Sequence, residues 1–195
     1  MRRVLLAGLL GGLAMFVWSS IAHMATPLGT MGISQMPNDQ PLLATLQHHG
    51  GGASALYMYP SLGTGADAMA EYEQKLAGTP SGLLLYHPAG QGRVFSPRLL
   101  VVEFITEVME ATLAAWLLAQ TRLPRYALRV AFIAVLGIVA AITTNVPYWN
   151  WYGFPPSYTA AYMLMQVVGF LVAGLVAARL VRPDLLRAEA ATFHA

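Results

Sequence analysis

Three glutamates within one apolar stretch are the residues of this sequence best suited to chemistry. Glu103, Glu107 and Glu110 lie in the run RLLVVEFITEVMEATLAAWLLAQ. An α-helix turns by about 100° per residue. Around the helix axis, Glu107 therefore lies about 40° to one side of Glu103, and Glu110 lies about 20° to the other side of Glu103. The three carboxyls therefore share one narrow helical face. Carboxylates arranged in this way can bind a hard cation through oxygen, or hold and release a proton.

Such a face has to be shielded, because the stretch around it is apolar enough to cross a bilayer. A charged side chain at mid-bilayer costs at least about 2.5 to 3.5 kcal/mol on insertion scales. Ser96 and Pro97 are typical of a helix start, with Ser as the N-cap and Pro at the first position. This start places Glu103 about one and a half turns inside the helix and Glu110 near mid-membrane. The carboxyls must then face other helices, a partner protein or water.

Polar side chains on the neighbouring apolar stretches occur at comparable depths. They predict a polar pocket open to the outside of the cell, which binds a cation, a proton or a small polar ligand. The predicted ligand-binding residues are Glu103, Glu107, Glu110, Thr144, Tyr162 and Gln166. A transition metal would require His23, at the end of the first apolar stretch, to join the carboxylates.

Four apolar stretches are long enough to position these residues across a membrane. A helix needs about 20 apolar residues to cross a hydrocarbon core of about 30 Å. The composition agrees, with 56% hydrophobic and 10% charged residues and a mean hydropathy of +0.54, against about 25% charged residues in an ordinary globular chain. The predicted spans are Val4–His23, Leu99–Ala119, Tyr126–Val146 and Thr159–Ala178.

Arginines near the ends of the predicted spans indicate the topology. They cluster before the first span, between the second and third, and after the fourth, so the positive-inside rule predicts that both termini are cytoplasmic. The opposite connection, Asn145 to Ser157, has no charge and is rich in aromatic residues, which suits the membrane interface. A cleaved signal peptide ending near Ala22 is the alternative for the first span, although its apolar stretch is long for one. The arginines are Arg2, Arg3, Arg122, Arg125, Arg129, Arg179, Arg182 and Arg187.

Residues 24–98, between the first and second spans, predict a small α/β cap outside the membrane. Asn38 can cap a short helix that runs to about His48, and a second helix is predicted over 66–77 with Gly78 as its C-cap. Two short apolar runs, 55–59 and 83–87, are each followed by proline and read as strands. We expect this cap to lean on the aromatic connection. The predicted domains are thus 1–23, 24–98 and 99–195, the last with three helices and a short cytoplasmic tail.

The predicted fold is therefore an α-helical membrane protein, a four-transmembrane-helix bundle with an α/β cap between helices 1 and 2. Gly8 and Gly12 form a Gly-xxx-Gly pair that lets another helix approach closely, either in the same bundle or in a second copy. The absence of cysteine excludes disulfides and thiolate metal sites. The arginines form no basic patch interleaved with aromatic residues, so no nucleic-acid partner is expected.

Three segments resemble a family of uncharacterised bacterial four-span membrane proteins. They are YHPAG at Tyr86–Gly90, FSP before the second span, and VPYWNWYGFP at Val146–Pro155. The resemblance implies a bacterial inner membrane and four spans. It assigns no functional residue, and the run ALYMYP departs from the more Phe-rich strand expected there.

Several functions remain open at this level. The favoured hypothesis is a membrane protein that is not an enzyme and whose pocket binds or relays a cation, proton or small polar ligand. In the alternative, an accessory subunit or assembly factor, the glutamate face and the cap contact a partner membrane protein or a second copy. The glutamates could also serve only as structural hydrogen-bonding groups. A hydrolase or transferase with a glutamate base lacks a recognisable nucleophile or motif, and the sequence indicates no cofactor.

Overall fold

The structure is a computed structural model that describes residues 1–92 and 95–183. Arg187, one of the arginines used to predict the topology, lies outside the described residues. The chain divides into two units, each with its own internal contacts. The first comprises Met1–Ile33 together with the chain from Ser96 onwards, and the second comprises Ser34–Phe95.

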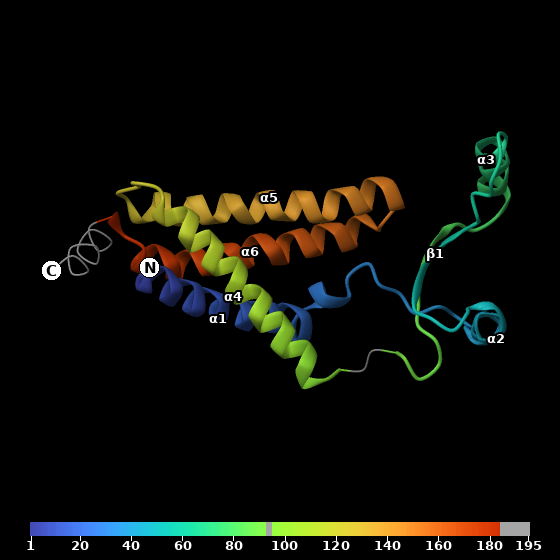
Figure 1. Cartoon of the computed structure of the whole chain (residues 1–195), viewed down its shortest axis with the longest axis horizontal. Coiled ribbons are helices and arrows are strands. Elements are labelled where there is room, and N and C mark those ends of the chain that lie inside the picture. Colours follow the sequence, from blue (N-terminus) through green and yellow to red (C-terminus); the bar gives the residue numbers. More distant parts are fainter. Residues whose placement is uncertain (93–94, 184–195) are drawn as a thin grey trace. The chain divides into compact units, whose positions relative to one another are not determined.

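The described part of the first unit contains four long helices (Figure 1). They are α1 (Arg2–Ala25), α4 (Pro97–Ala119), α5 (Tyr126–Tyr152) and α6 (Pro156–Leu180), and a short 3-10 helix, η1 (Pro27–Thr30), follows α1. Helix α1 packs against both α4 and α6, and α5 packs along α6. Helix α4 contacts α1 extensively but touches α5 and α6 only briefly.

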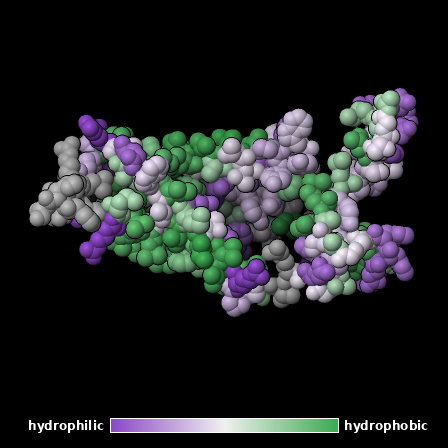
Figure 2. All heavy atoms as spheres, in the orientation of Figure 1, coloured by the Kyte–Doolittle hydropathy of each residue, from purple (hydrophilic) through white to green (hydrophobic). Residues whose placement is uncertain are grey.

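Among the described residues, three helices are long and apolar enough to cross a membrane, namely α1, α5 and α6. Large apolar side chains such as Leu5, Val139 and Leu164 are exposed on these helices. Figure 2 shows the resulting apolar surface over the helices of the first unit. These features are those of a multi-pass membrane protein. Helix α4 is similar in length, but it contains Arg98 and the three glutamates.

Helix α4 begins as its sequence predicts, with Ser96 as the N-cap and Pro97 in the first turn. Helix α5, in contrast, continues to Tyr152 instead of ending at Val146, so most of the predicted connection from Asn145 to Ser157 is helical. Pro147 removes one backbone donor without ending the helix. Gly153 ends it, because its φ of +68° is a left-handed conformation that glycine adopts without a steric penalty.

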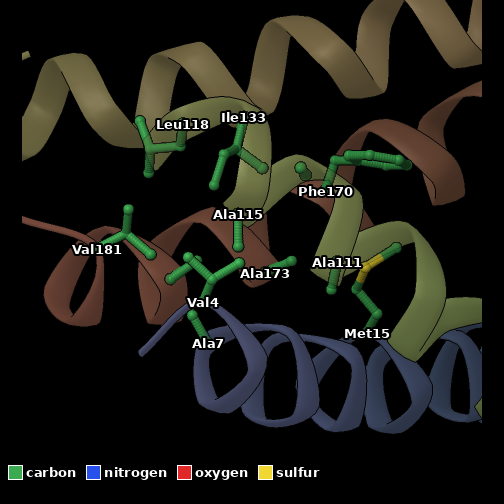
Figure 3. Close-up of a cluster of buried hydrophobic side chains, with 12 residues drawn as sticks. Val4, Ala7, Met15, Ala111, Ala115, Leu118, Ile133, Phe170, Ala173 and Val181 are labelled. Carbon is green, nitrogen blue, oxygen red and sulfur yellow. The ribbon is translucent and has the colours of Figure 1, made fainter. Parts of the chain in front are cut away.

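Small residues form much of the core between the helices (Figure 3). Ala7 of α1, Ala115 of α4 and Ala173 of α6 are almost completely buried. Helices in lipid gain little from the hydrophobic effect when they associate, so close van der Waals packing through small residues has to hold them together. The larger side chains of this core are Val4, Met15, Leu118, Ile133, Phe170 and Val181.

The Gly-xxx-Gly pair is used within the chain, at the contact between α1 and α4. A Cβ atom on Gly8 would lie 2.7 Å from the Cα atom of Thr112, and one on Gly12 would lie 2.7 Å from the backbone nitrogen of Val108. The contact continues along both helices in steps of four residues. The next pair is Phe16 and Phe104, whose rings meet edge-on with 5.6 Å between centroids. Rows of this spacing are typical of helices that cross obliquely.

Arg129 is a tertiary anchor rather than a surface charge. Its side chain is 6% exposed. Its Nε donates to the carbonyl oxygen of Ala178 at 3.0 Å, and its Nη1 donates to those of Leu123 at 3.1 Å and Pro124 at 2.7 Å. The guanidinium thus ties the α4–α5 connection to the last turns of α6. From the sequence, Arg129 was expected only to mark the cytoplasmic side, and this anchoring role was not predicted.

The second unit contains two short helices and a two-stranded antiparallel sheet. Its elements are α2 (Gln40–His49), β1 (Ala55–Tyr59), α3 (Ala68–Gly78) and β2 (Gly82–Tyr86). The register pairs Ala55 with Tyr86 and Tyr59 with Gly82. The Tyr86 hydroxyl donates to the carbonyl oxygen of Gly51 at 3.1 Å, which ties β2 to the turn after α2. The predicted α/β content of this segment is therefore present.

Several predicted boundaries in the second unit were wrong, including the start of α3, which is Ala68 instead of residue 66. Asp39, not Asn38, precedes α2, because Asn38 takes a positive φ of +51° and cannot belong to the helix start. Gly78 is the last residue of α3, and Thr79 is its C-cap. Strand β2 ends before His87, since β1 offers no residue opposite it in this register. The His87 Nδ1 instead lies 3.0 Å from the Ser54 hydroxyl.

Candidate functional site

A cavity of about 410 Å³ in the first unit contains every residue predicted to bind a ligand. Helices α1, α4, α5 and α6 all contribute to its lining, so no pair of neighbouring helices could form it alone. The predicted residues that line it are Glu103, Glu107, Glu110, Thr144, Tyr162, Gln166 and His23. The lining residues that were absent from the predicted set are Met15, Trp18, Ser19, Thr106, Asn145, Met165 and Gly169.

The glutamates of α4 form one wall of this cavity but differ strongly in burial. Glu103 is exposed and Glu110 is partly buried, whereas Glu107 is only 6% exposed. The Oε2 atom of Glu107 is completely enclosed and has no hydrogen-bond partner among the described residues. Ser19 of α1 lies beside this carboxyl, and Glu103 and Glu110 interact with it electrostatically. The helical period predicted the shared face, but not that Glu107 is the most buried of the three carboxyls.

The opposite wall comes from α5 and α6, which are joined there by a polar contact. The Asn145 side-chain amide donates to the carbonyl oxygen of Ala141 at 2.9 Å and to the Gln166 Oε1 at 3.3 Å. Thr144 lies next to this pair on the exposed side. Asn145 was recognised with Thr144 as a polar residue at the outer end of the third span, but it was not included in the predicted ligand-binding set.

Helix α1 contributes an indole and an imidazole to the cavity. The Trp18 Nε1 donates to the carbonyl oxygen of Met165 at 2.9 Å, so the indole bridges α1 and α6 at the cavity wall. The His23 ring meets the Tyr162 ring edge-on, with 5.9 Å between centroids. Tyr162 in turn stacks on Tyr158 at 4.2 Å. Sequence reasoning missed Trp18 because a single tryptophan in an apolar span is more often a packing or interface residue.

The cavity is acidic, with no opposite charge built into its wall. Within the described ranges, no lysine or arginine lines it. A carboxylate that lines a cavity without a basic partner lacks the compensation that buried charges normally have. The site therefore favours occupants that bring positive charge or hydrogen-bond donors.

His23 was predicted as a ligand for a transition metal. In the part of the chain that the structure describes, no group of three His, Asp or Glu side chains is arranged to hold a metal ion. The His23 Nδ1 lies 2.9 Å from the carbonyl oxygen of Ser19, and the ring packs against Tyr162. In this geometry His23 belongs to the aromatic part of the lining.

No protein-family model, curated protein or solved structure matches this chain.

Proposed function

We propose that this chain is a four-span protein of the bacterial inner membrane, with both termini in the cytoplasm, whose outward-facing cavity binds or relays a cation, a proton or a small polar ligand. The observation that carries the proposal is the Glu107 carboxyl, which lines a cavity of about 410 Å³ and whose solvent-shielded Oε2 atom has no hydrogen-bond partner among the described residues. Glu103 and Glu110 flank it on the same helix face.

The unpaired oxygen of the Glu107 carboxyl favours a binding site over a merely structural role. A buried polar atom that lacks a hydrogen bond costs about 1 to 3 kcal/mol, and more when it is charged. A glutamate that only joined helices would avoid this cost by pairing both carboxyl oxygens, whereas Glu107 interacts with Ser19 of α1 and still leaves one oxygen unpaired in the described part of the chain. The described neighbours leave Oε2 unpaired. A proton, a cation or a donor group in the cavity would supply the missing interaction.

The surface of α4 supports a fourth span. With 23 residues this helix is about 35 Å long, enough to cross a hydrocarbon core. Ile105, Met109, Leu113 and Trp116 are all at least 45% exposed on the side away from the cavity. Such a row of large apolar side chains needs lipid or protein around it, while the glutamates face the cavity.

The topology can be tested by labelling single introduced cysteines. The chain has no native cysteine, so no other residue of this protein reacts with the label. We expect Gly52→Cys to react with a membrane-impermeant maleimide on intact cells, since Gly52 has nothing within 4 Å of its Cβ position. We expect Arg122→Cys, in the α4–α5 connection, to react only after the membrane is permeabilised. Labelling of both positions on intact cells would show that α4 does not cross, and the four-span proposal would be wrong.

The site itself is tested by Glu107→Gln and Glu107→Leu in the full chain reconstituted in lipid. Glutamine keeps the shape of the side chain and removes its charge. We expect the glutamine variant to fold normally and to bind cations at least about tenfold more weakly, because a hydrogen bond to a charged group contributes about 1.5 to 3 kcal/mol. The leucine variant should lose binding to the same extent or more. The measurement is calorimetric titration with protons, Mg²⁺, Ca²⁺, Mn²⁺ and an organic ammonium ion.

Normal binding by the glutamine variant would contradict the proposal. So would a wild-type protein that binds none of these cations. In either case the accessory-subunit hypothesis would lead, and a stoichiometric partner in mild-detergent purifications would support it.

A further inference from the structure

The aromatic side chains of the cavity narrow the kind of cation that it suits. Trp18 and Tyr162 line the cavity together with the glutamates, and the hydrogen bond from the Trp18 Nε1 to Met165 holds the indole in place. The negative faces of such rings attract cations within about 6 Å of the ring centroid, and tryptophan and tyrosine are the strongest of these residues. Protein sites for quaternary ammonium groups combine aromatic walls with negative charge in this way.

A row of aromatic rings continues from Tyr162 away from the cavity. Tyr162 stacks on Tyr158 at 4.2 Å, Tyr158 meets Phe154 at 5.3 Å, and Phe154 meets Tyr148 at 5.3 Å between centroids. The row follows the end of α5 and the start of α6. Because Tyr162 also lines the cavity, the row connects the cavity wall to further aromatic side chains.

The size of the cavity disfavours a bare metal ion. Calcium sites supply six to eight oxygen ligands at about 2.3 to 2.6 Å, and magnesium requires a near-octahedral arrangement. The described residues contain no group of three side chains arranged to hold a metal. A volume of about 410 Å³ lies instead in the range of sites for organic ligands, about 300 to 1,000 Å³. Met15 and Met165 add flexible apolar surface that adapts to ligands of different shapes.

We propose that the occupant of this cavity is an organic ammonium ion with apolar substituents, whose charge pairs with Glu107 and whose ammonium group packs against Trp18 and Tyr162. This inference rests on the proposed function and goes beyond it by naming the class of ligand. Glu103, at the exposed side of the cavity, would meet the ion first, and the buried carboxyl of Glu107 would hold it.

The test uses benzyltrimethylammonium as the probe and the full chain in lipid. We expect saturable binding of the labelled probe to the wild type. Unlabelled probe should compete, and neopentylbenzene, its uncharged isostere, should compete at least tenfold more weakly. Mg²⁺, Ca²⁺ and Mn²⁺ at equal concentration should displace less of the probe than the unlabelled ammonium ion does. These comparisons need only the wild-type protein, so no folding defect can confuse them.

Tyr162 provides a matched pair of variants. Tyr162→Phe keeps the ring, and we expect probe binding within threefold of the wild type. Tyr162→Leu removes the ring and should weaken binding about tenfold, in line with the strength of a partly desolvated cation–π contact. Equal loss in both variants would assign the effect to the hydroxyl and would overturn the cation–π part of the proposal. Glu107→Gln should abolish probe binding, and Glu103→Gln, at an exposed position, should weaken it.

The outcomes separate this inference from the proposed function. If the probe fails to bind while protons or a metal ion bind in a manner that Glu107→Gln abolishes, the ligand class is wrong and the proposed function holds. If neopentylbenzene competes as well as the ammonium ion, the cavity recognises apolar surface alone and the inference is again wrong. If no cation binds at all, both proposals fall together.

Discussion

Replacing Gly12 with leucine should separate α1 from α4 and leave little folded protein in lipid. Even a Cβ atom at this position would lie 2.7 Å from the backbone nitrogen and from the Cγ2 of Val108, and backbone atoms cannot rotate out of the way. Overpacking alone costs about 1 to 3 kcal/mol, and leucine adds three further carbon atoms. We expect a loss of at least about 3 kcal/mol in the free energy of unfolding, measured by denaturant titration of the reconstituted protein.

The neighbouring residue Gly11, also on α1, provides the control for this prediction. A Cβ atom on Gly11 would lie 3.4 Å from the Ala111 Cβ, a contact that neighbouring side chains can accommodate. Gly11→Ala should therefore be neutral or slightly stabilising, because alanine favours a helix by about 1 kcal/mol relative to glycine. Gly12→Ala should destabilise clearly, although the change in helix propensity is the same. Equal stability of the two alanine variants would contradict the close α1–α4 contact.

Gly12 also bears on the cavity, because its contact with Val108 lies one residue from Glu107. If α4 moves away from α1, Ser19 no longer lies beside Glu107 and the enclosed carboxyl becomes open to water. We therefore expect Gly12→Ala to weaken cation binding as well as stability. A variant that lost stability but bound cations normally would show that the cavity does not depend on this contact.

Replacing Arg129 with methionine should have the second large effect on stability. The guanidinium makes three hydrogen bonds of 2.7 to 3.1 Å to backbone carbonyls, and the side chain is buried. Methionine has a similar length but donates none of these bonds, so three carbonyl oxygens lose a charged donor. We expect a loss of about 3 kcal/mol or more in the free energy of unfolding.

Arg125 allows a matched control, because it carries the same charge one turn before Arg129, at the N-cap of α5, but its side chain is exposed. Arg125→Met should change the free energy of unfolding by no more than about 0.5 kcal/mol, as is usual for surface positions. Both variants remove one positive charge from the same end of α5, so any shared effect would come from topology. Arg129→Lys should fall between them, since a single ammonium group cannot reproduce the fork of the guanidinium. Equal effects at positions 125 and 129 would refute the anchoring role.

The sequence by itself was enough to locate the long helices and the shared face of the three glutamates. Both follow from local properties of the backbone: apolar length determines where a helix can cross lipid, and the helical period determines which side chains share a face. Ser96 and Pro97 marked the start of α4 for the same reason, since capping depends on a few adjacent residues. Strand β1 was likewise bounded by its apolar run and by Pro60.

Only the tertiary structure decided which of these residues form a site. Glu107 is enclosed and Glu103 is exposed because α4 packs on α1 through Gly12 and diverges from α5 and α6, and that packing joins residues nearly 100 positions apart in the chain. Trp18 and Asn145 line the cavity and hydrogen-bond to α6, and the sequence pattern does not identify those bonding partners. The sequence indicated Arg129 only as a marker of topology, whereas in the structure it is buried and anchors backbone carbonyls. The reason is the same, because the burial of a side chain depends on the helices that surround it and not on the residues next to it in the sequence.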